Sequence, residues 1–227
     1  MSSRVVRQEH EDGGGVKAPP GEEHPPGRPA GGARTSERGA ATRSALLAAA
    51  EEVFTSVGFA QAGVTEVVAR AGASVGSLYH HFSGKADLFL TLYEEFQRRQ
   101  QDRTRAANHA ARDAGEDDPM RLLLAGARAY LDGCIEERAL SRLFLSGDGP
   151  PGFDAIVRRR LRDWTNRNAA LFRRAGEPAD EPFLVVFSGT MAAATSEVSL
   201  NDDEEHARAL ADEVLDIIAS LSDARRP

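Results

Sequence analysis

The feature that most constrains the fold of this chain is a helical hydrophobic period that runs from about Thr42 to Leu221. Apolar residues recur three or four positions apart along this stretch, and only short turn-rich breaks interrupt them. We find no convincing alternation of apolar and polar residues of the kind that half-buried strands show, and no internal repeat. The sequence therefore predicts an all-α fold, and 227 residues are enough to bury a core without metals or disulfides.

The segment before this stretch has a different composition. Residues 1–33 hold seven glycines and five of the eleven prolines, with few apolar residues. Such a segment cannot repay the entropy of ordering, so residues 1–38 are expected to form a disordered tail.

Charge and cysteine content narrow the compartment and the partners. The formal charge of -7 lies in the C-terminal half, because residues 106–227 carry 15 basic and 22 acidic residues while residues 34–105 carry nine and eight. The middle segment is therefore near neutral, which permits binding to nucleic acid. Cys134 is the single cysteine, so no internal disulfide forms. No apolar run approaches the 18–20 residues of a membrane span and no signal peptide is evident, so a cytoplasmic protein without a membrane partner is expected.

Three short helices are predicted before a longer fourth one. The first runs from Thr42, its expected N-cap, to Val57, with Gly58 as its stop. The second runs from Val64 to Ala71 and ends at Gly72. Ser74 caps the third, which reaches Phe82, and Lys85 begins the fourth. A three-residue turn between the second and third helices gives a helix-turn-helix.

The residues of this arrangement carry a specific family pattern. Residues 42–59 and 64–88 resemble the DNA-binding domain of the tetracycline-repressor (TetR) family. The matching pattern is a glycine turn, a serine, a small residue, a Leu-Tyr pair, two residues, a short break and a lysine. The resemblance implies a helix-turn-helix domain over residues 39–86 and a helical ligand-binding and dimerisation domain over residues 87–227.

The third helix has the composition of a recognition helix. Leu78 and Phe82 form its buried face, while Ser77 and His80 lie opposite and are predicted to meet base edges. Val75 is placed to meet a thymine methyl group. The resemblance gives phosphate contacts to Tyr79 and Lys85. The full predicted DNA-binding set is Arg43, Thr65, Ser74, Val75, Ser77, Tyr79, His80 and Lys85.

One position departs from the family pattern. Relatives usually have Ser or Thr at the N-cap of the second helix, and this chain has Gly63. Glycine is an acceptable cap but has no hydroxyl for a phosphate, and Thr65 is the substitute considered. In the tail, Arg28 and Pro29 are candidates for a minor-groove arm, although an inert linker is the favoured interpretation.

The C-terminal half is predicted to hold further helices over Met120–Glu137, Leu140–Ser146, Phe153–Ala175 and Pro182–Leu200, and a last one opened by Asp202 with Glu205 as its capping partner. The segment 182–200 is apolar on nearly every face and needs cover all round. By resemblance, the last two helices pair with their copies in a homodimer. The resemblance also implies a small-molecule pocket among the middle helices, with candidate lining residues Tyr130, Cys134, Phe144, Trp164, Asn168, Phe187 and Met191.

The expected function is a transcriptional regulator, most simply a repressor, that binds a pseudo-palindromic double-stranded operator as a homodimer and is released by a small molecule. It needs no cofactor or metal and is not an enzyme. A DNA-binding dimer without an inducer, acting architecturally or under a protein partner, is the alternative. A third hypothesis, an esterase with Ser74 in a nucleophile elbow, is disfavoured because the residues before Ser74 have helical rather than strand spacing.

Overall fold

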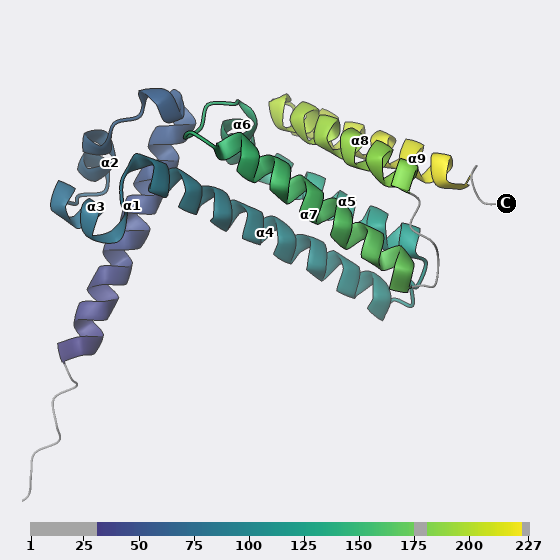
Figure 1. Cartoon of the computed structure of the whole chain (residues 1–227), viewed down its shortest axis with the longest axis horizontal. Coiled ribbons are helices and arrows are strands. Elements are labelled where there is room, and N and C mark those ends of the chain that lie inside the picture. The colour runs from purple at the N-terminus through teal and green to yellow at the C-terminus, as the bar shows by residue number, and fades with distance from the viewer. Residues whose placement is uncertain (1–30, 175–180, 224–227) are drawn as a thin grey trace, which may run out of the picture.

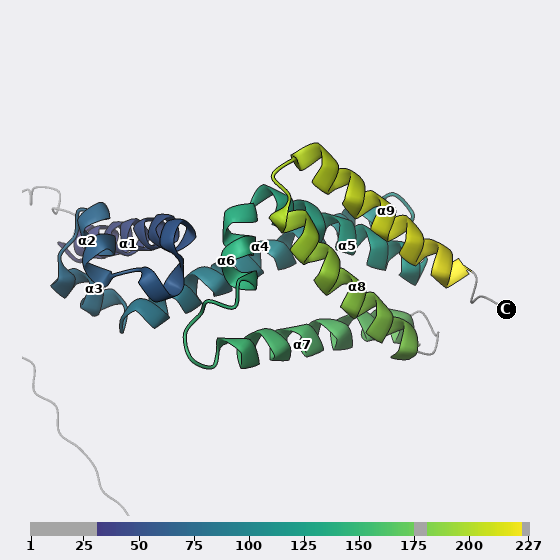
Figure 2. The ribbon, with the colours of Figure 1, turned by 90° about the horizontal axis from the view of Figure 1, so that it is seen from above.

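The computed structural model describes residues 31–174 and 181–223, and every regular element in those two ranges is an α-helix. Figures 1 and 2 show α1, α2 and α3 gathered at one end of an elongated molecule, and in Figure 1 α4 runs from that end below α5 to α9. The all-α prediction is confirmed. The helices are α1 (Gly31–Gln61), α2 (Val64–Arg70), α3 (Val75–His81), α4 (Lys85–Asp113), α5 (Pro119–Glu136), α6 (Arg138–Leu145), α7 (Phe153–Arg174), α8 (Glu181–Leu200) and α9 (Glu204–Asp223).

The start of α1 differs from the expectation. This helix begins at Gly31, so residues 31–38 are helical rather than part of a disordered tail, and residues 1–30, including the proposed arm at Arg28 and Pro29, lie outside the described residues. Thr42 is not an N-cap, because its hydroxyl donates to the carbonyl of Arg38 at 2.9 Å within the helix. Gly58 does leave helical geometry, at φ 79° and ψ 170°, but a further helical turn follows it.

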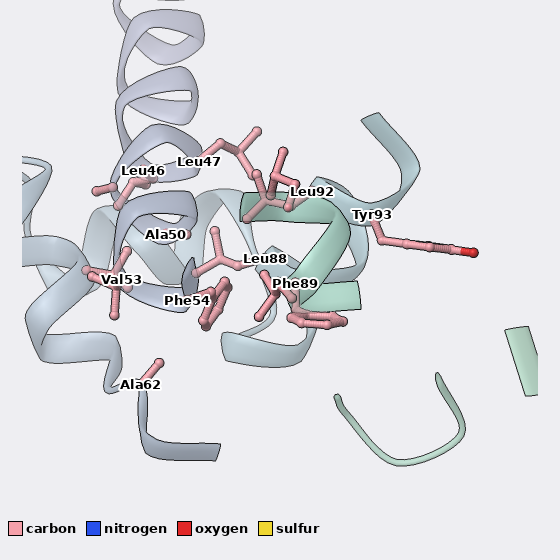
Figure 3. Close-up of a cluster of buried hydrophobic side chains, with 14 of the residues drawn as sticks. Leu46, Leu47, Ala50, Val53, Phe54, Ala62, Leu88, Phe89, Leu92 and Tyr93 are labelled. Atoms are coloured by element: carbon pink, nitrogen blue, oxygen red, sulfur yellow. The ribbon is translucent and has the colours of Figure 1, made fainter. Parts of the chain in front are cut away.

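The N-terminal helices share a core with the first turns of α4. Leu46, Val53 and Phe54 of α1 are fully buried against Leu88 and Phe89 of α4, as Figure 3 shows. Burial of each of these side chains contributes about 1.5–3 kcal/mol. The same cluster continues into Leu140, Leu143 and Phe144 of α6 and Phe153 of α7. The core therefore does not stop at residue 86, where the domain boundary was expected.

A second core lies between α5, α8 and α9. Its fully buried members include Leu131 of α5, Phe187 and Val198 of α8, and Ala207 and Ala211 of α9. Small alanines on α9 let that helix approach α5 and α8 closely. Tyr130 of α5 packs against both cores and therefore joins them.

The α4–α5 contact is close because two glycines of α5 face α4. A Cβ atom on Gly126 would lie 3.0 Å from Cγ2 of Thr104, and one on Gly133 would lie 3.0 Å from Cδ of Arg103. Polar residues of α4 line this seam, and the side-chain oxygens of Gln100 and Asn108 are buried there without a hydrogen-bond partner among the described residues. Larger side chains at these glycines would push the two helices apart.

The helix α8 is apolar enough to change one expectation. By length and composition it meets the criterion for a membrane-spanning helix. The prediction that no apolar run approaches the length of a membrane span is therefore wrong for α8. About half of it is buried against neighbouring helices, and Phe187, Met191 and Val198 lie in the second core. A core helix of a globular protein has this pattern.

The cap of α9 also differs from the prediction. The Oδ1 atom of Asp203 accepts from the backbone N–H groups of Glu205 and His206 at 3.0 and 3.1 Å, so Asp203 rather than Asp202 caps the helix. The carboxylate of Asp202 instead accepts from Arg142 of α6 at 2.7 Å. The Asp202 side chain is thus engaged by Arg142, and the Asp203 side chain caps α9.

Candidate nucleic-acid interface and effector site

The turn between α2 and α3 is built by Gly72 and Ser74. Gly72 has φ +60°, and the N–H groups of Gly72 and Ala73 donate to the carbonyls of Ala69 at 3.3 Å and Val68 at 2.9 Å. This is the Schellman arrangement, which ends α2 and requires a residue that tolerates the left-handed conformation. The Ser74 hydroxyl then accepts from the N–H of Ser77 at 3.0 Å and caps α3. Both predicted signals act as expected.

The helix α3 presents one buried and one exposed face. Leu78 is fully buried and Phe82, which follows the helix, is 3% exposed. Val75 is 43% exposed and Tyr79 57% exposed, and His80 is exposed as well. An exposed valine and an exposed tyrosine on a short helix have no packing role of their own in the chain, so this surface is available to a partner.

Of the other predicted DNA contacts, Ser77 and Arg43 already interact with neighbouring side chains, whereas Thr65 is exposed. Ser77 is half-buried, and its hydroxyl lies 3.1 Å from the hydroxyl of Ser74, so it is engaged with the cap. Thr65 is exposed in the first turn of α2, and Gly63 forms no side-chain cap there. The guanidinium of Arg43 lies 5.2 Å from the centre of the Phe82 ring and 3.8 Å from the carboxylate of Glu95.

Lys85 has the most unexpected environment of the predicted set. Its ammonium donates to the carbonyl oxygens of Phe59 at 2.8 Å and Ala60 at 3.1 Å, and it lies 4.4 Å from the centre of the Phe59 ring. An ammonium has three N–H donors, so one remains for a phosphate. The phosphate contact of Lys85 stays a prediction, and the structure adds a second task at the end of α1.

The esterase hypothesis has no structural support at Ser74. The preceding residues form the helix α2, whereas a nucleophile elbow needs a strand before the serine. The Ser74 hydroxyl accepts from a backbone N–H as a cap. His80 and His81 contact each other edge to face at 5.0 Å between ring centres. A Ser–His hydrogen bond, which the chemistry would need, is absent from the described residues.

The predicted effector residues divide between the two cores. Phe144 belongs to the first core, where its ring meets Phe89, Tyr93 and Phe153. Phe187 and Met191 belong to the second core. Trp164 of α7 stacks on Phe187 with 5.3 Å between ring centres and 16° between planes. Phe144 is therefore separate from the aromatic group around Trp164, and the seven candidates do not form one cluster.

Tyr130 and Cys134 form a buried polar pair between the cores. The Tyr130 phenol interacts with the Cys134 thiol and the Thr195 hydroxyl, and the Ser141 hydroxyl donates to the carbonyl of Cys134 at 3.2 Å. Burial raises the pKa of Cys134 to about 12, although hydrogen bonds to Ser141 and Tyr130 oppose the rise. Burial also raises the pKa of the Tyr130 phenol well above 10.0. Both groups are neutral near pH 7.

Asn168 is the candidate whose chemistry is left incomplete. Its Nδ2 atom is buried with no hydrogen-bond partner among the described residues. It lies one turn after Trp164 on α7, and between them Thr165 makes a 2.9 Å hydroxyl contact with Ser188 of α8. A buried donor without an acceptor is costly, so a bound acceptor would offset that cost.

Two further residues of this region were missed from the sequence. Phe183 stacks on Phe187 with 6.0 Å between ring centres, and Thr195 faces Tyr130. The spacing of Phe183 and Phe187, four residues apart on one helix, was a usable sign of a shared face. Nothing local identified Thr195, because its role depends on a tyrosine on another helix.

Known transcriptional regulators are similar to this chain in sequence, most clearly over the helix-turn-helix. Residues 46–92 match the profile of the family described as bacterial regulatory proteins, tetR family. The transcriptional regulator AcuR of Cereibacter sphaeroides is 30% identical over 179 aligned positions, which cover 66% of this chain and 72% of that protein. The transcriptional repressor BepR of Brucella suis is 42% identical over 59 residues, or 26% of this chain and 28% of its own. The transcriptional activator FasR of Mycolicibacterium smegmatis is 45% identical over 69 residues, or 30% of this chain and 32% of its own.

Solved structures are similar to this chain in fold over more than three quarters of its length. The regulator FadR from Bacillus subtilis, solved in complex with stearoyl-CoA, superposes with a TM-score of 0.62 at 17% identity and covers 78% of this chain and 97% of its own. A transcriptional regulator from Aquifex aeolicus gives a TM-score of 0.59 at 18% identity, with 79% and 99% covered. With the capped turn, the exposed face of α3 and the relationship to AcuR, these findings show that the chain belongs to the TetR family of DNA-binding bacterial transcriptional regulators.

Proposed function

We propose that this regulator is a repressor that occupies a pseudo-palindromic operator as a homodimer and leaves it when a small molecule binds the C-terminal half. The observation that carries the proposal is the position of two exposed surfaces. Val75 and Tyr79 are exposed on α3 at one end of the molecule, and α8 and α9 expose apolar side chains at the other. A two-fold axis through the apolar surface gives two recognition helices at a fixed spacing, as two half-sites require.

The proposed dimer surface consists of apolar side chains on the outer faces of α8 and α9. Val185 is 69% exposed, Val186 53%, Leu200 61%, Ile217 59% and Leu221 47%. Gly189, Ala192 and Ala193 leave the surface of α8 between them shallow, so a second helix can approach. Apolar surface of this extent on adjacent helices is best covered by a second copy of the same two helices.

The proposed effector site lies beside the Trp164–Phe187 stack. The apolar and aromatic side chains there suit an apolar or amphipathic molecule, and the unpaired Nδ2 of Asn168 suits a carbonyl or carboxylate oxygen on it. Of the remaining proposed contacts, Met191 belongs to the second core, Cys134 belongs to the first, and Tyr130 packs against both. Because FadR was solved with stearoyl-CoA, a long-chain acyl thioester is a suitable first probe.

DNA binding and assembly are tested together on the purified chain. Selection of bound duplexes from random DNA is expected to return an inverted repeat, and light scattering at micromolar concentration is expected to report a dimer. A monomer, or selected sequences without two-fold symmetry, would contradict the proposal. Fusion of the selected operator to a reporter then distinguishes repression from activation, since the relatives include one regulator of each kind.

Effector binding is tested with the single tryptophan, Trp164. Titration with stearoyl-CoA is expected to change its fluorescence and to release the selected operator duplex. Asn168→Leu should raise the dissociation constant for stearoyl-CoA about tenfold, the effect of one lost hydrogen bond. Asn166→Leu, on the exposed side of α7, should leave this constant unchanged. Equal effects of the two variants would remove Asn168 from the site.

The second candidate function is a DNA-binding dimer without a small-molecule inducer. An operator complex that neither acyl thioesters nor whole-cell extract reverses would favour it. Both candidates place the protein in the cytoplasm with the chromosome and require no cofactor, metal or enzymatic activity.

A further inference from the structure

The loop between α6 and α7 makes a directional contact with the end of α1. Both carboxylate oxygens of Asp148 accept from the backbone N–H of Ala60, at 3.0 and 3.1 Å, across 88 positions of sequence. The backbone N–H of Asp148 in turn donates to the hydroxyl of Ser146 at 3.1 Å, which holds the loop in place. A charged acceptor on a backbone N–H is stronger and more directional than apolar packing.

Gly58 makes this approach feasible in two ways. Its φ of +79° belongs to the left-handed region, and this turn of the chain interrupts α1 and starts a new helical turn that contains Ala60. The N–H groups at the start of a helical turn lack partners within the helix, so the carboxylate takes the place of a cap. A Cβ atom at position 58 would lie 2.5 Å from Oδ2 of Asp148, so only glycine leaves room for the carboxylate.

The same short segment is also held by α4. Lys85, the first residue of α4, donates to the carbonyls of Phe59 and Ala60. The Phe59 ring packs on Phe89 of α4 at 5.1 Å, and Phe89 packs on Phe153 of α7 at 5.0 Å. The aromatic contacts join the two parts of the molecule edge to face, and the hydrogen bonds of Asp148 and Lys85 add defined donor–acceptor geometry at the end of α1.

From this geometry we infer that Asp148 is a positioning residue for DNA recognition, which sets the orientation of the helix-turn-helix against the C-terminal half and passes displacements of α6 to α3. Ala60 lies just before α2, and α1 packs on both α2 and α3. A shift of the α6–α7 loop therefore moves the segment that carries the recognition helix. The inference rests on the proposed function only where operator binding is the readout.

The test compares Asp148→Ala and Asp148→Asn with Asp163→Ala, a change at an exposed aspartate on α7. Without DNA, hydrogen exchange of the Ala60 amide is expected to rise about tenfold or more in Asp148→Ala and less in Asp148→Asn, which keeps one acceptor oxygen. With the selected operator duplex, the unsubstituted protein should gain protection in α6. The Asp148→Ala variant should bind the duplex and lose that gain.

Three results would overturn the inference. The first is unchanged exchange at Ala60 in Asp148→Ala, which shows that the contact does not hold this segment. The second is operator-induced protection of α6 that survives the substitution. The third is a uniform rise of exchange in every helix of Asp148→Ala without DNA, which indicates a structural role alone. The exchange measurement needs no DNA, so it decides the contact even if the chain binds no operator and the proposed function fails.

Discussion

The Cys134 thiol and the Tyr130 phenol show how single polar residues are accommodated between two apolar cores. Both side chains are neutral because burial disfavours their ionised forms, and each provides the other with a hydrogen-bonding partner. Removing the phenol hydroxyl would leave the thiol and the Thr195 hydroxyl with fewer partners. The pair therefore links α5 to α8 through the contact of Tyr130 with Thr195, and to α6 through the contact of Cys134 with Ser141.

Alkaline pH should destabilise the protein through this pair. A raised pKa in the folded state means that the folded protein holds its proton at a pH where the unfolded chain has lost it, so the stability contributed by the pair falls as pH rises above 9.0 for the thiol and 10.0 for the phenol. Thermal unfolding between pH 8 and pH 11 should show this fall. The double substitution Cys134→Ala with Tyr130→Phe should flatten the profile in that range, and an unaltered profile would contradict the assignment.

The same raised pKa predicts low reactivity of the cysteine. With a pKa of about 12, the thiolate fraction of Cys134 near pH 8 is lower than that of an ordinary thiol by at least about a hundredfold. Iodoacetamide should therefore modify Cys134 only after denaturation. Mass spectrometry of folded and urea-unfolded samples measures this difference, and rapid labelling of the folded sample would be inconsistent with it.

Tyr79 is the residue at which the DNA contact is most directly tested. Tyr79→Phe removes one hydroxyl from a side chain that is 57% exposed, so folding should be unaffected. Operator affinity should fall about tenfold, the effect of losing a hydrogen bond to a charged phosphate, and its salt dependence should stay the same because no charge is lost. Fluorescence anisotropy at several salt concentrations measures both. Full affinity in Tyr79→Phe would exclude a phosphate contact by the hydroxyl.

Among the elements, α6 acts as a clamp on the α8–α9 turn. The Arg142 guanidinium donates to the carbonyls of Ser199 at 2.5 Å and Leu200 at 3.0 Å, and Arg138 donates to the carbonyl of Asp202 at 2.7 Å. The last carbonyls of a helix lack partners within the helix, and a guanidinium near them also interacts favourably with the helix dipole. The end of α8 is thus fixed by the helix that also contacts α1.

Arg142→Ala should lower the free energy of unfolding by about 1–2 kcal/mol, chiefly because the partly buried carbonyl of Ser199 loses its donor, while the acceptors at Leu200 and Asp202 are exposed. Arg121→Ala is the matched control, since Arg121 is 74% exposed with one ion pair at 3.4 Å and should change stability by less than about 0.5 kcal/mol. Urea denaturation measures both.

Arg142 lowers the pKa of Asp202, so the part of the clamp that depends on this carboxylate should be lost as pH falls below 3.8.

Helix positions could be predicted where the deciding contacts are local. The period of apolar residues located α2 to α9 within a few residues, and Gly72 and Ser74 identified the turn because their effect depends on backbone geometry alone. The start of α1 was wrong because the residues before Thr42 have no apolar stripe, although they are helical. The cap of α9 was wrong because Arg142, distant in sequence, attracts Asp202.

The candidate sites also combine features that the local sequence predicts with features that depend on distant residues. The exposed face of α3 followed from its own spacing, but the contacts of Lys85 with Phe59 and Ala60 depend on how α1 bends at Gly58. Asp148 lies in a glycine- and proline-rich break with no sign of its partner. Phe144 and Phe187 both looked like pocket residues, and only the packing of α6 against α1 and α4 assigned them to different cores.

At the scale of the molecule, the elongated shape separates the DNA-binding end from the proposed dimer surface. Figure 2 shows α8 and α9 on the side of the C-terminal half away from α1, α2 and α3. In the proposed dimer, assembly and DNA contact therefore use different surfaces, and a change to one should leave the other chemically intact. Operator affinity still depends on assembly, because one half-site contributes only part of the binding free energy.

Val186→Asp should convert the dimer to a monomer and abolish tight operator binding, because it places a charge in the apolar contact. Leu161→Asp is the control, because Leu161 is 42% exposed on α7 and outside the proposed surface. Light scattering and circular dichroism give the mass and the helix content. A dimeric Val186→Asp, or a monomeric Leu161→Asp, would move the interface elsewhere.

The close packing of α4 on α5 at Gly126 and Gly133 has a consequence for genetics. A methyl group at either glycine would press on side chains of α4, and α4 begins at the helix-turn-helix, so we expect the change to alter operator binding without touching DNA or ligand. In a screen for mutants that express the regulated genes constitutively, alanine and serine replacements at these two codons should therefore be recovered alongside changes in α3. Such alleles should produce normal amounts of folded dimer, unlike the core mutants that the same screen collects.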